Sequence, residues 1–256
     1  MDPKLSSPAQ ATRESSMAVR IDRSGLIATV TIDRPEAENK LDAATVDALA
    51  DALESLQAGD DPADVVILAG AGPDFSLGRP PKGSGPPTPS GLVAEFSRIQ
   101  RLNELVQRYP AVTIAKVHGR AFGAALSLSG RCDFVILAED ARLSFPEVHH
   151  GLPPTIVLAH YRYVLSRRVL LDLILTGREI DGSEAVAMGI ATRAVPAAEL
   201  DATVDDLARE IAGHGSRTLR TIKRFMAASE GMDPRDAPAL GIAMITNELV
   251  DRSLSQ

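Results

Sequence analysis

Along this chain, uninterrupted apolar runs alternate with segments whose apolar residues recur at helical spacing. Runs of small and β-branched residues, which are typical of buried strands, occupy residues 26–32, 65–69, 112–117 and 133–138. Apolar residues three or four apart predict helices over residues 42–57, 92–109, 155–175, 183–188, 197–213, 216–229 and 236–252. Strands and helices alternate early and helices dominate late. The pattern therefore predicts an α/β core followed by a helical C-terminal region.

The chain divides into three parts where its composition changes. Residues 1–16 are polar, contain Pro3 and Pro8, and predict a flexible N-terminal arm. Residues 17–196 form the predicted core domain, and residues 197–256 form the helical region. These last helices carry apolar stripes with too little core of their own to bury them. We therefore expect this region to associate with other copies of the chain.

A long loop separates the second predicted strand from the helix that follows it. It covers residues 70–91 and is rich in Pro, Gly and Ser. Loops of this length inside a compact domain are usually functional or mobile. We expect residues 80–91 to be mobile without a ligand and to become ordered when one binds, because they offer few apolar anchors.

The composition indicates a soluble globular protein. Of its 256 residues, 45% are hydrophobic and 24% charged, which is ample for a core. The formal net charge of −7 argues against general nucleic-acid binding, because a protein that binds nucleic acid needs a positively charged surface to contact the phosphates. The longest uncharged stretch, residues 148–161, is broken by prolines, so no membrane span is expected. Cys132 is the one cysteine and residues 1–16 lack a signal sequence, which predicts a reducing, cytoplasmic setting without an internal disulfide or a cysteine-based zinc site.

Three segments carry candidate chemistry, although each also has a plain structural interpretation. Residues 74–79 follow a buried strand, and their backbone N–H groups could face a ligand or belong to a surface turn. Residues 119–125 place small residues at a helix N-terminus, which favours an oxyanion and close helix–strand packing about equally. Glu147 follows Phe145 and Pro146, and burial would raise its pKa and suit it to proton transfer. A solvated loop carboxylate is the alternative.

Together these segments resemble the enoyl-CoA hydratase/isomerase family, also called the crotonase family. The strongest similarity is Val117-His118-Gly119-Arg120-Ala121-Phe122-Gly123-Ala124-Ala125, which is similar to the family's VHGYALGGG. Phe75-Ser76-Leu77-Gly78 is similar to FSAG, and Phe145-Pro146-Glu147 with Gly151 is similar to FGQPEVxLG. Further similar segments, in the family's order, are residues 32–37, 132–133, 175–177 and 185–191. The resemblance covers about residues 18–230.

The resemblance implies a crotonase-like spiral of ββα units that assembles through its C-terminal helices into a homotrimer or a dimer of trimers. It also implies an acyl-CoA thioester as the small-molecule substrate, with no separate cofactor and no metal. The backbone N–H groups of Arg79 and Ala124 would form an oxyanion hole for the thioester enolate. Glu147 matches one acid/base position of the family's hydratases, and Ser127 stands where their second glutamate is expected. The other residues implied at the substrate are Ala37, Glu38, Phe75, Leu77, Gly78, Gly123, His149 and His150.

A single carboxylate favours double-bond isomerisation over hydration. Migration from the β,γ to the α,β position needs one base, which moves a proton from the α-carbon to the γ-carbon. Three alternatives stay open. A hydratase would use Ser127 or a histidine to position water, and a thioester hydrolase would need a histidine within hydrogen-bond reach of Ser127. The third is a catalytically weak homologue that binds acyl-CoA or a partner.

Overall fold

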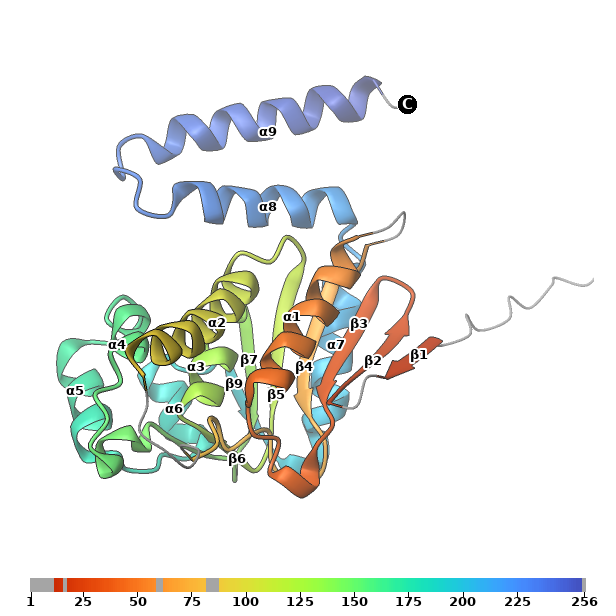
Figure 1. The fold of residues 1–256 in the computed structure, drawn as a ribbon. Helices are drawn as coiled ribbons and strands as arrows, with labels where there is room; N and C mark the ends of the chain where they lie inside the picture. The colour runs from red at the N-terminus through yellow and green to blue at the C-terminus, as the bar shows by residue number, and fades with distance from the viewer. Residues whose placement is uncertain (1–11, 16–17, 59–61, 82–87, 255–256) are drawn as a thin grey trace, which may run out of the picture.

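A mostly parallel sheet forms the centre of the molecule. The computed structural model describes residues 12–15, 18–58, 62–81 and 88–254 (Figure 1). Within these residues, the main sheet has seven strands in the order β1-β2-β3-β4-β5-β7-β9. Their bounds are β1 Thr12–Ser15, β2 Val19–Ser24, β3 Ile27–Ile32, β4 Val65–Gly70, β5 Val112–Val117, β7 Phe134–Ala138 and β9 Arg193–Val195. The first three pair antiparallel and the others parallel.

A small second sheet and a set of helices complete the core. The second sheet pairs β6 (Arg120–Phe122) with β8 (Arg142–Ser144) in parallel. The core helices are α1 Ala43–Gln57, α2 Pro89–Gln107, α3 Ala124–Ser129, α4 Thr155–Tyr161, α5 Arg167–Thr176, α6 Gly182–Met188 and α7 Leu200–Ala212. Short 3-10 turns lie at η1 Pro35–Ala37, η2 Pro146–His150 and η3 Ala197–Glu199. None of the described helices is long and apolar enough to span a bilayer.

The central strands have unbroken apolar sequences because helices cover the sheet on both faces. In Figure 1, α1 lies in front of the strands and α7 lies behind them. All but the last residue of β4 is buried, and β5 has only one partly exposed residue. Parallel strands in such a layer bury both faces, so no polar alternation appears in the sequence. The predicted α/β core is confirmed.

The N-terminal arm and one long helix differ from their predictions. Residues 12–15 pair with β2, with Thr12 opposite Arg23, because the outer edge of β2 offers N–H and C=O groups to any extended segment. Residues 1–11 and 16–17 lie outside the described residues, as do residues 82–87 of the loop predicted to be mobile. The end of that loop differs from the prediction, because residues 89–91 form the first turn of α2, where the Thr88 side chain accepts a hydrogen bond from Gly91 N. The predicted helix 155–175 is two helices, and α5 begins after Ser166, whose side chain accepts a hydrogen bond from Val169 N.

The helices after residue 197 divide into one that belongs to the core and two that do not. The apolar stripe of α7 is buried against the sheet, which differs from the prediction that this whole region lacks a core. Helices α8 (Ser216–Ser229) and α9 (Ala237–Leu254) form a pair that stands off the core (Figure 1). Lys223 Nζ lies 2.6 Å from a carboxylate oxygen of Asp133 and ties α8 to the core.

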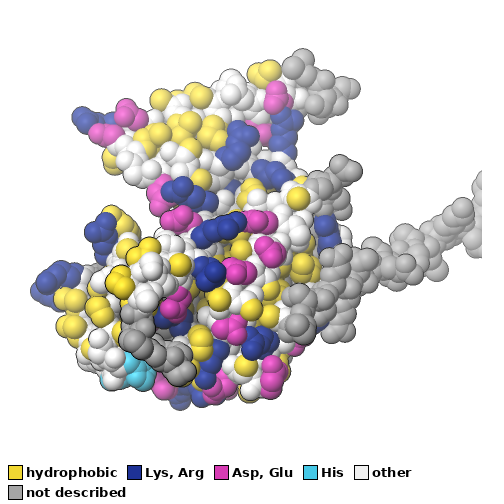
Figure 2. All heavy atoms as spheres, viewed as in Figure 1, with side chains coloured by type: hydrophobic (Ala, Val, Ile, Leu, Met, Phe, Trp, Pro, Cys, Tyr) yellow, Lys and Arg dark blue, Asp and Glu magenta, His cyan; other side chains and the backbone are white. Residues whose placement is uncertain are grey.

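The pair of α8 and α9 exposes a large apolar surface. Figure 2 shows hydrophobic side chains gathered along it. Its large apolar residues are each between 51% and 67% exposed: Ile222, Met226, Ile242, Ile245, Leu249 and Val250. Contiguous apolar surface of this kind marks an interaction site in a folded protein.

Candidate active site

A glycine turn brings two backbone segments into contact at the carboxyl ends of β4 and β5. Residues 75 and 76 run beside β6, because Ser76 N donates to Arg120 O (3.1 Å) and Phe122 N donates to Ser76 O (3.1 Å). Gly78 has a φ of 72° and fits against β6: a Cβ there would lie 2.4 Å from Phe122 O and 3.3 Å from Ala124 N. Only glycine allows this approach.

The approach places two unpaired amides next to one another. Arg79 follows Gly78, and Ala124 is the first residue of α3, so its N–H has no partner within the helix. Neither N–H donates to an acceptor among the described residues. Gly123 N donates to Ser144 O (2.8 Å), which anchors the turn just before Ala124. Two such free donors can stabilise an oxyanion.

A half-buried glutamate faces this turn. Glu147 lies in η2, and a Cβ on Gly123 would lie 2.9 Å from its Oε1. Its Oε2 is buried and has no hydrogen-bond partner among the described residues. Burial raises the pKa of Glu147 above its ordinary value of 4.5, although the charges of Arg79 and His150 partly oppose the increase. A carboxylate with a raised pKa is a better proton acceptor for carbon acids.

Ser127 lies one turn of α3 beyond Ala124 and carries a second unpaired polar atom. The residue is 2% exposed, and its Oγ has no hydrogen-bond partner in the described part of the chain. No described histidine is therefore within hydrogen-bond reach of this hydroxyl. A serine nucleophile needs such a base, so the thioester-hydrolase hypothesis finds no support.

Two cavities meet at these groups. The first, which we call the acyl cavity, has a volume of about 400 Å³ and the second, the entrance cavity, about 640 Å³. Both are lined by Arg79, Ala124, Glu147 and Leu152. The remaining lining residues of the acyl cavity are Phe96, Ile99, Asn103, Ser127, Pro153, Pro154, Thr155, Ile156 and Val157. A bound molecule can therefore run from one cavity into the other past the two amides and Glu147.

The side chain of Arg79 is held by α2 and leaves its own N–H accessible. Its Nε donates to Glu95 Oε1 (3.0 Å), and its guanidinium lies 4.6 Å from the centre of the Phe96 ring. These contacts join the 75–79 segment to the wall of the acyl cavity. The sequence resemblance identified Arg79 by its backbone alone, and the ion pair with Glu95 was not predicted.

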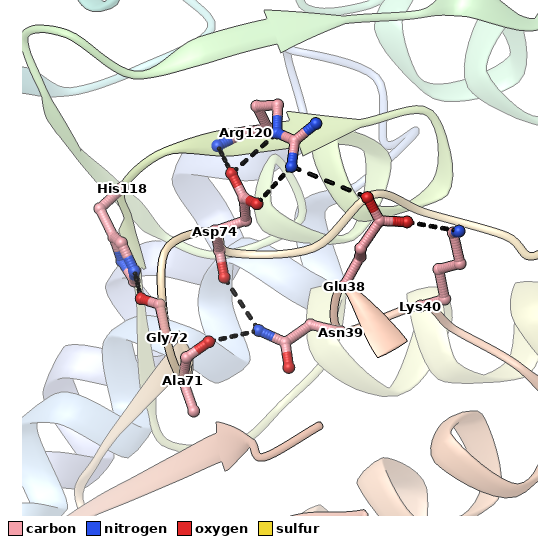
Figure 3. A network of polar contacts seen from close by, with 8 residues as sticks. All are labelled: Glu38, Asn39, Lys40, Ala71, Gly72, Asp74, His118 and Arg120. Atoms are coloured by element: carbon pink, nitrogen blue, oxygen red, sulfur yellow. Dashed lines mark hydrogen bonds and ion pairs between the residues drawn. The ribbon is translucent and has the colours of Figure 1, made fainter. Parts of the chain in front are cut away.

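A polar network fixes the loop that carries the first amide (Figure 3). Asn39 is buried with a φ of 51°, and its Nδ2 donates to Ala71 O (2.7 Å) and Asp74 O (2.9 Å). Its Oδ1 accepts from Arg34 N (3.0 Å). These bonds hold residues 71–74 against η1, so the loop cannot move independently of the core.

The same network joins this loop to β6. The carboxylate of Asp74 accepts from Arg120 N (2.8 Å), Nε (3.0 Å) and Nη2 (2.7 Å). These hydrogen bonds from Arg120 hold the pKa of Asp74 below its usual range. Glu38 lies 3.8 Å from Arg120 Nη2 and accepts from Lys40 Nζ (2.6 Å), as Figure 3 shows. The segments bearing Arg79 and Ala124 are thereby tied together by side chains as well as by backbone.

The structure brings some predicted substrate residues to the cavities and not others. Leu77, Gly123 and His150 line the entrance cavity. Gly78 packs behind the two amides.

Four predicted substrate residues lie elsewhere. Phe75 is fully buried in the core, so its side chain supports the loop instead of touching a ligand. The His149 ring lies against Gly177 and is exposed. Ala37 and Glu38 line neither cavity, and Glu38 belongs to the network of Figure 3.

Two lining residues were missed by the sequence reasoning. Asn103 lies four residues after Ile99 on the apolar side of α2, and a polar residue at an apolar helical position was the available signal. Lys40 lines the entrance cavity and follows the predicted substrate residue Glu38 by two positions, but no sequence pattern marked Lys40 itself.

Comparisons with known proteins agree with this geometry, in which a backbone oxyanion site lies beside a buried carboxyl on an α/β core. A model of the family "Enoyl-CoA hydratase/isomerase" matches residues 22–245. A putative enoyl-CoA hydratase of Thermus thermophilus is 31% identical over 215 residues, covering 83% of this chain and 85% of the relative. A hydroxycinnamoyl-CoA hydratase-lyase of Pseudomonas fluorescens is 30% identical over 211 residues, covering 80% and 76%.

A solved structure is also similar along nearly the whole chain. The enoyl-CoA hydratase of Mycobacterium smegmatis superposes with a TM-score of 0.88 at 25% identity, covering 92% of both chains. The fold and the site thus define an enzyme of the crotonase type. The chain belongs to the enoyl-CoA hydratase/isomerase family, as its sequence motifs predicted.

The raised pKa of Glu147 predicts a pH-dependent effect on stability. Between pH 4.5 and the raised pKa, the folded protein holds a proton that the unfolded chain has released, so wild-type stability falls as pH rises through this window. Glutamine has no such proton. We expect Glu147→Gln to raise Tm at neutral and alkaline pH, and the gain to shrink as pH falls toward 4.5. Thermal denaturation across pH measures it, with Glu210→Gln on the exposed side of α7 as the control. A gain that is constant with pH would contradict the assignment.

Proposed function

We propose that this enzyme moves the double bond of an enoyl-CoA from the β,γ to the α,β position, with Glu147 as the only acid/base group. One observation carries the proposal. Among the described residues, Glu147 is the one carboxylate lining either cavity, and it lies where both meet beside Arg79 and Ala124. The position of a second carboxylate is occupied by the neutral Ser127.

The residues support the following sequence of steps. The thioester oxygen accepts hydrogen bonds from the N–H groups of Arg79 and Ala124. The Glu147 carboxylate takes a proton from the α-carbon, and the electron pair of that C–H bond is delocalised onto the thioester oxygen as a dienolate. The protonated Glu147 then delivers the same proton to the γ-carbon, and the electrons return to form the α,β double bond. No water, oxidant or metal is consumed, and no separate cofactor is required.

The shapes of the two cavities suggest how the substrate lies. The acyl cavity is walled mainly by apolar side chains of α2 and residues 152–157, which suits a hydrocarbon chain. The entrance cavity carries Lys40 and His150, polar side chains that suit the CoA moiety. Lys40 would exchange its ion pair with Glu38 for one with a phosphate of CoA. The thioester would then lie at the junction, within reach of Glu147.

A comparison of two substrates tests the proposal. We expect the purified enzyme to convert trans-3-hexenoyl-CoA into its conjugated 2-enoyl isomer, followed by the absorbance of the conjugated thioester. Crotonyl-CoA should be hydrated far more slowly, because hydration needs a second group to activate water. Efficient hydration of crotonyl-CoA without isomerisation of the 3-enoyl ester would overturn the proposal.

Hydration is the second candidate, and the names of the relatives favour it. The similar proteins are named as a hydratase, a hydratase-lyase and, in Salmonella arizonae, a carnitinyl-CoA dehydratase. The unpaired Oγ of Ser127 lies in the same cavity as Glu147 and could hold the water that adds to the β-carbon. In that case the hydrated product, 3-hydroxybutyryl-CoA, accumulates from crotonyl-CoA and Ser127→Ala removes most of that activity.

We also propose that the chain assembles as a homotrimer or a dimer of trimers through α8 and α9. The support is the exposed apolar stripe on these two helices. We expect Leu249→Asp combined with Ile242→Asp to lower the sedimentation mass to that of the monomer, because two charges would be buried at the interface. Asn247→Asp, an exposed residue on the same helix, is the matched control. A monomeric wild type at micromolar concentration would refute the assembly.

A further inference from the structure

The acyl cavity contains polar atoms that the proposed reaction does not use. In the described part of the chain, buried side-chain atoms without a hydrogen-bond partner are Asn103 Nδ2, Ser127 Oγ, Arg131 Nε and Glu147 Oε2. All but Arg131 line the acyl cavity. The unpaired Oε2 of Glu147 is explained by the proposed role of this residue in proton transfer. Asn103 and Ser127 are 1% and 2% exposed and lie on different helices, α2 and α3, yet line the same cavity.

Leaving these two groups unpaired is unfavourable for the empty enzyme. A buried donor or acceptor without a partner loses its hydration and gains nothing in return. Packing alone would be satisfied by an apolar residue at position 103, since its helix neighbours Ile99, Leu102 and Val106 are all buried. A bound molecule that supplies the missing partner explains both groups at once.

The chemistry of the two groups limits what that partner can be. An asparagine amide nitrogen only donates, and a serine hydroxyl donates or accepts, so the partner is an oxygen acceptor. A carboxylate fits poorly, because Glu147 lies in the same cavity. Arg79, the one described residue that brings a guanidinium to this cavity, is already paired with Glu95. A neutral hydroxyl or carbonyl oxygen fits both donors.

The position of Ser127 places this oxygen farther along the acyl cavity than the thioester oxygen. Ser127 follows Ala124 by one turn of α3, which is about 4.5 Å along the helix axis. Asn103 reaches the cavity from α2, on the side of the apolar wall formed by Phe96 and Ile99. The oxygen therefore belongs to the acyl chain past the β-carbon, and not to the thioester.

We propose that Asn103 and Ser127 are specificity-determining residues, which select an enoyl-CoA whose acyl chain carries a neutral hydroxyl or keto oxygen beyond the β-carbon. The inference rests on the proposed function, because it assumes an acyl-CoA in this cavity. It names the substrate class more narrowly than the family does, and it makes a plain hydrocarbon chain the poorer substrate. Such discrimination follows when a site built for a hydrogen bond is given an analogue that lacks the oxygen.

Direct binding and turnover test the inference separately from the proposed function. The probes are trans-3-octenoyl-CoA, its 5-, 6- and 7-hydroxy and 6- and 7-oxo derivatives, and a chain of equal length that ends in a carboxylate. Binding is measured by calorimetry on Glu147→Gln, and kcat/KM on the wild type. We expect at least one neutral oxygenated ester to be preferred over the plain ester by about 10-fold or more, and the carboxylate to be disfavoured. Comparing the hydroxy esters with the oxo esters shows whether the site prefers a hydroxyl or a carbonyl oxygen.

Substitutions then assign the preference to the two residues. Asn103→Leu and Ser127→Ala should each reduce the ratio of kcat/KM for the oxygenated ester over the plain ester by about 5-fold or more, and Ser97→Ala, an exposed serine on α2, should leave it unchanged. Asn103→Leu should not lower Tm, since it removes an unpaired buried group. A lower Tm would show that Asn103 is structural and overturn the inference.

The outcomes separate the two hypotheses. If the wild type turns over the plain ester and shows no preference for a neutral oxygen, the inference fails and the proposed function stands. If it turns over none of the esters and Glu147→Gln binds none of them, the proposed function fails, and the inference that rests on it is overturned with it. A preference for the carboxylate ester would overturn the neutral-oxygen assignment and point to Arg79 instead.

Discussion

Replacing Glu147 with glutamine should abolish turnover while leaving the fold and acyl-CoA binding nearly intact. Glutamine keeps the shape of the side chain and removes the base. General acid–base catalysis contributes about 10²–10⁴-fold, and a residue that both takes and returns the proton should lie at the top of that range. Isomerisation kinetics on a 3-enoyl-CoA, with calorimetric binding of the same ester, measure both parts of the prediction.

Ser127→Ala is the matched comparison for this prediction. Its hydroxyl lies in the same cavity, but it has no base within hydrogen-bond reach among the described residues. On a plain 3-enoyl-CoA we expect it to cost much less than Glu147→Gln. If the serine variant proved the more damaging of the two, the hydratase reading would replace isomerisation. If neither variant affected turnover, His150, which lines the entrance cavity beside Glu147, would be the next candidate base.

Replacing Gly123 with alanine should lower kcat by at least about 100-fold. Its φ of 52° disfavours any side chain, and the new Cβ would lie 2.9 Å from Glu147 Oε1 and 3.5 Å from Glu147 Cδ. The carboxyl must therefore move away from the junction of the cavities, and a misplacement of about 1 Å can cost 10²-fold in rate. The turn that presents Ala124 N would be strained as well. Steady-state kinetics and Tm together report the effect.

The control for Gly123→Ala separates strain from displacement. Gly189 has a φ of 83° and has no atom within 4 Å of the position that a Cβ would take. Gly189→Ala thus introduces a similar backbone strain at the end of α6, away from the cavities, and should lower Tm without lowering kcat. Full activity of Gly123→Ala would mean that the carboxyl does not need its present position, and the assignment of Glu147 would be lost.

Much of the site could be predicted because its elements are local. The motif at residues 117–125 identifies a strand, a turn and a helix N-terminus from neighbouring residues alone. The resemblance to the family's motifs assigned the two amides to Arg79 and Ala124 by their positions in residues 75–79 and 123–125. The close approach of Gly78 to Phe122 O and Ala124 N agrees with that assignment. Glu147 was found because it follows Phe145 and Pro146 in a recognisable order.

Other parts of the site depend on contacts between residues far apart in the sequence. The carboxylate of Asp74 bonds to Arg120, and Asn39 bonds to the carbonyl of Ala71. No local pattern reveals such partners, because either side chain could equally be solvated at the surface. Phe75 is a residue that the motif placed at the substrate but the structure does not. The packing around Phe75 buries its ring in the core.

The sequence by itself determined the α/β class, the positions of four buried strands and the family, because apolar periodicity and the residues of a motif are properties of neighbouring residues. The order of the strands in the sheet came from the tertiary structure. Tertiary structure alone decided which polar groups are buried together. In the sequence, Asn103 is a single polar residue on a predicted helix, and only the packing of α2 over α3 shows that it lines a cavity. Glu147 is likewise a loop carboxylate in the sequence, and only the structure shows that it lies against Gly123. Burial sets both the raised pKa of Glu147 and the missing partner of Asn103, and burial is a property of the assembled fold.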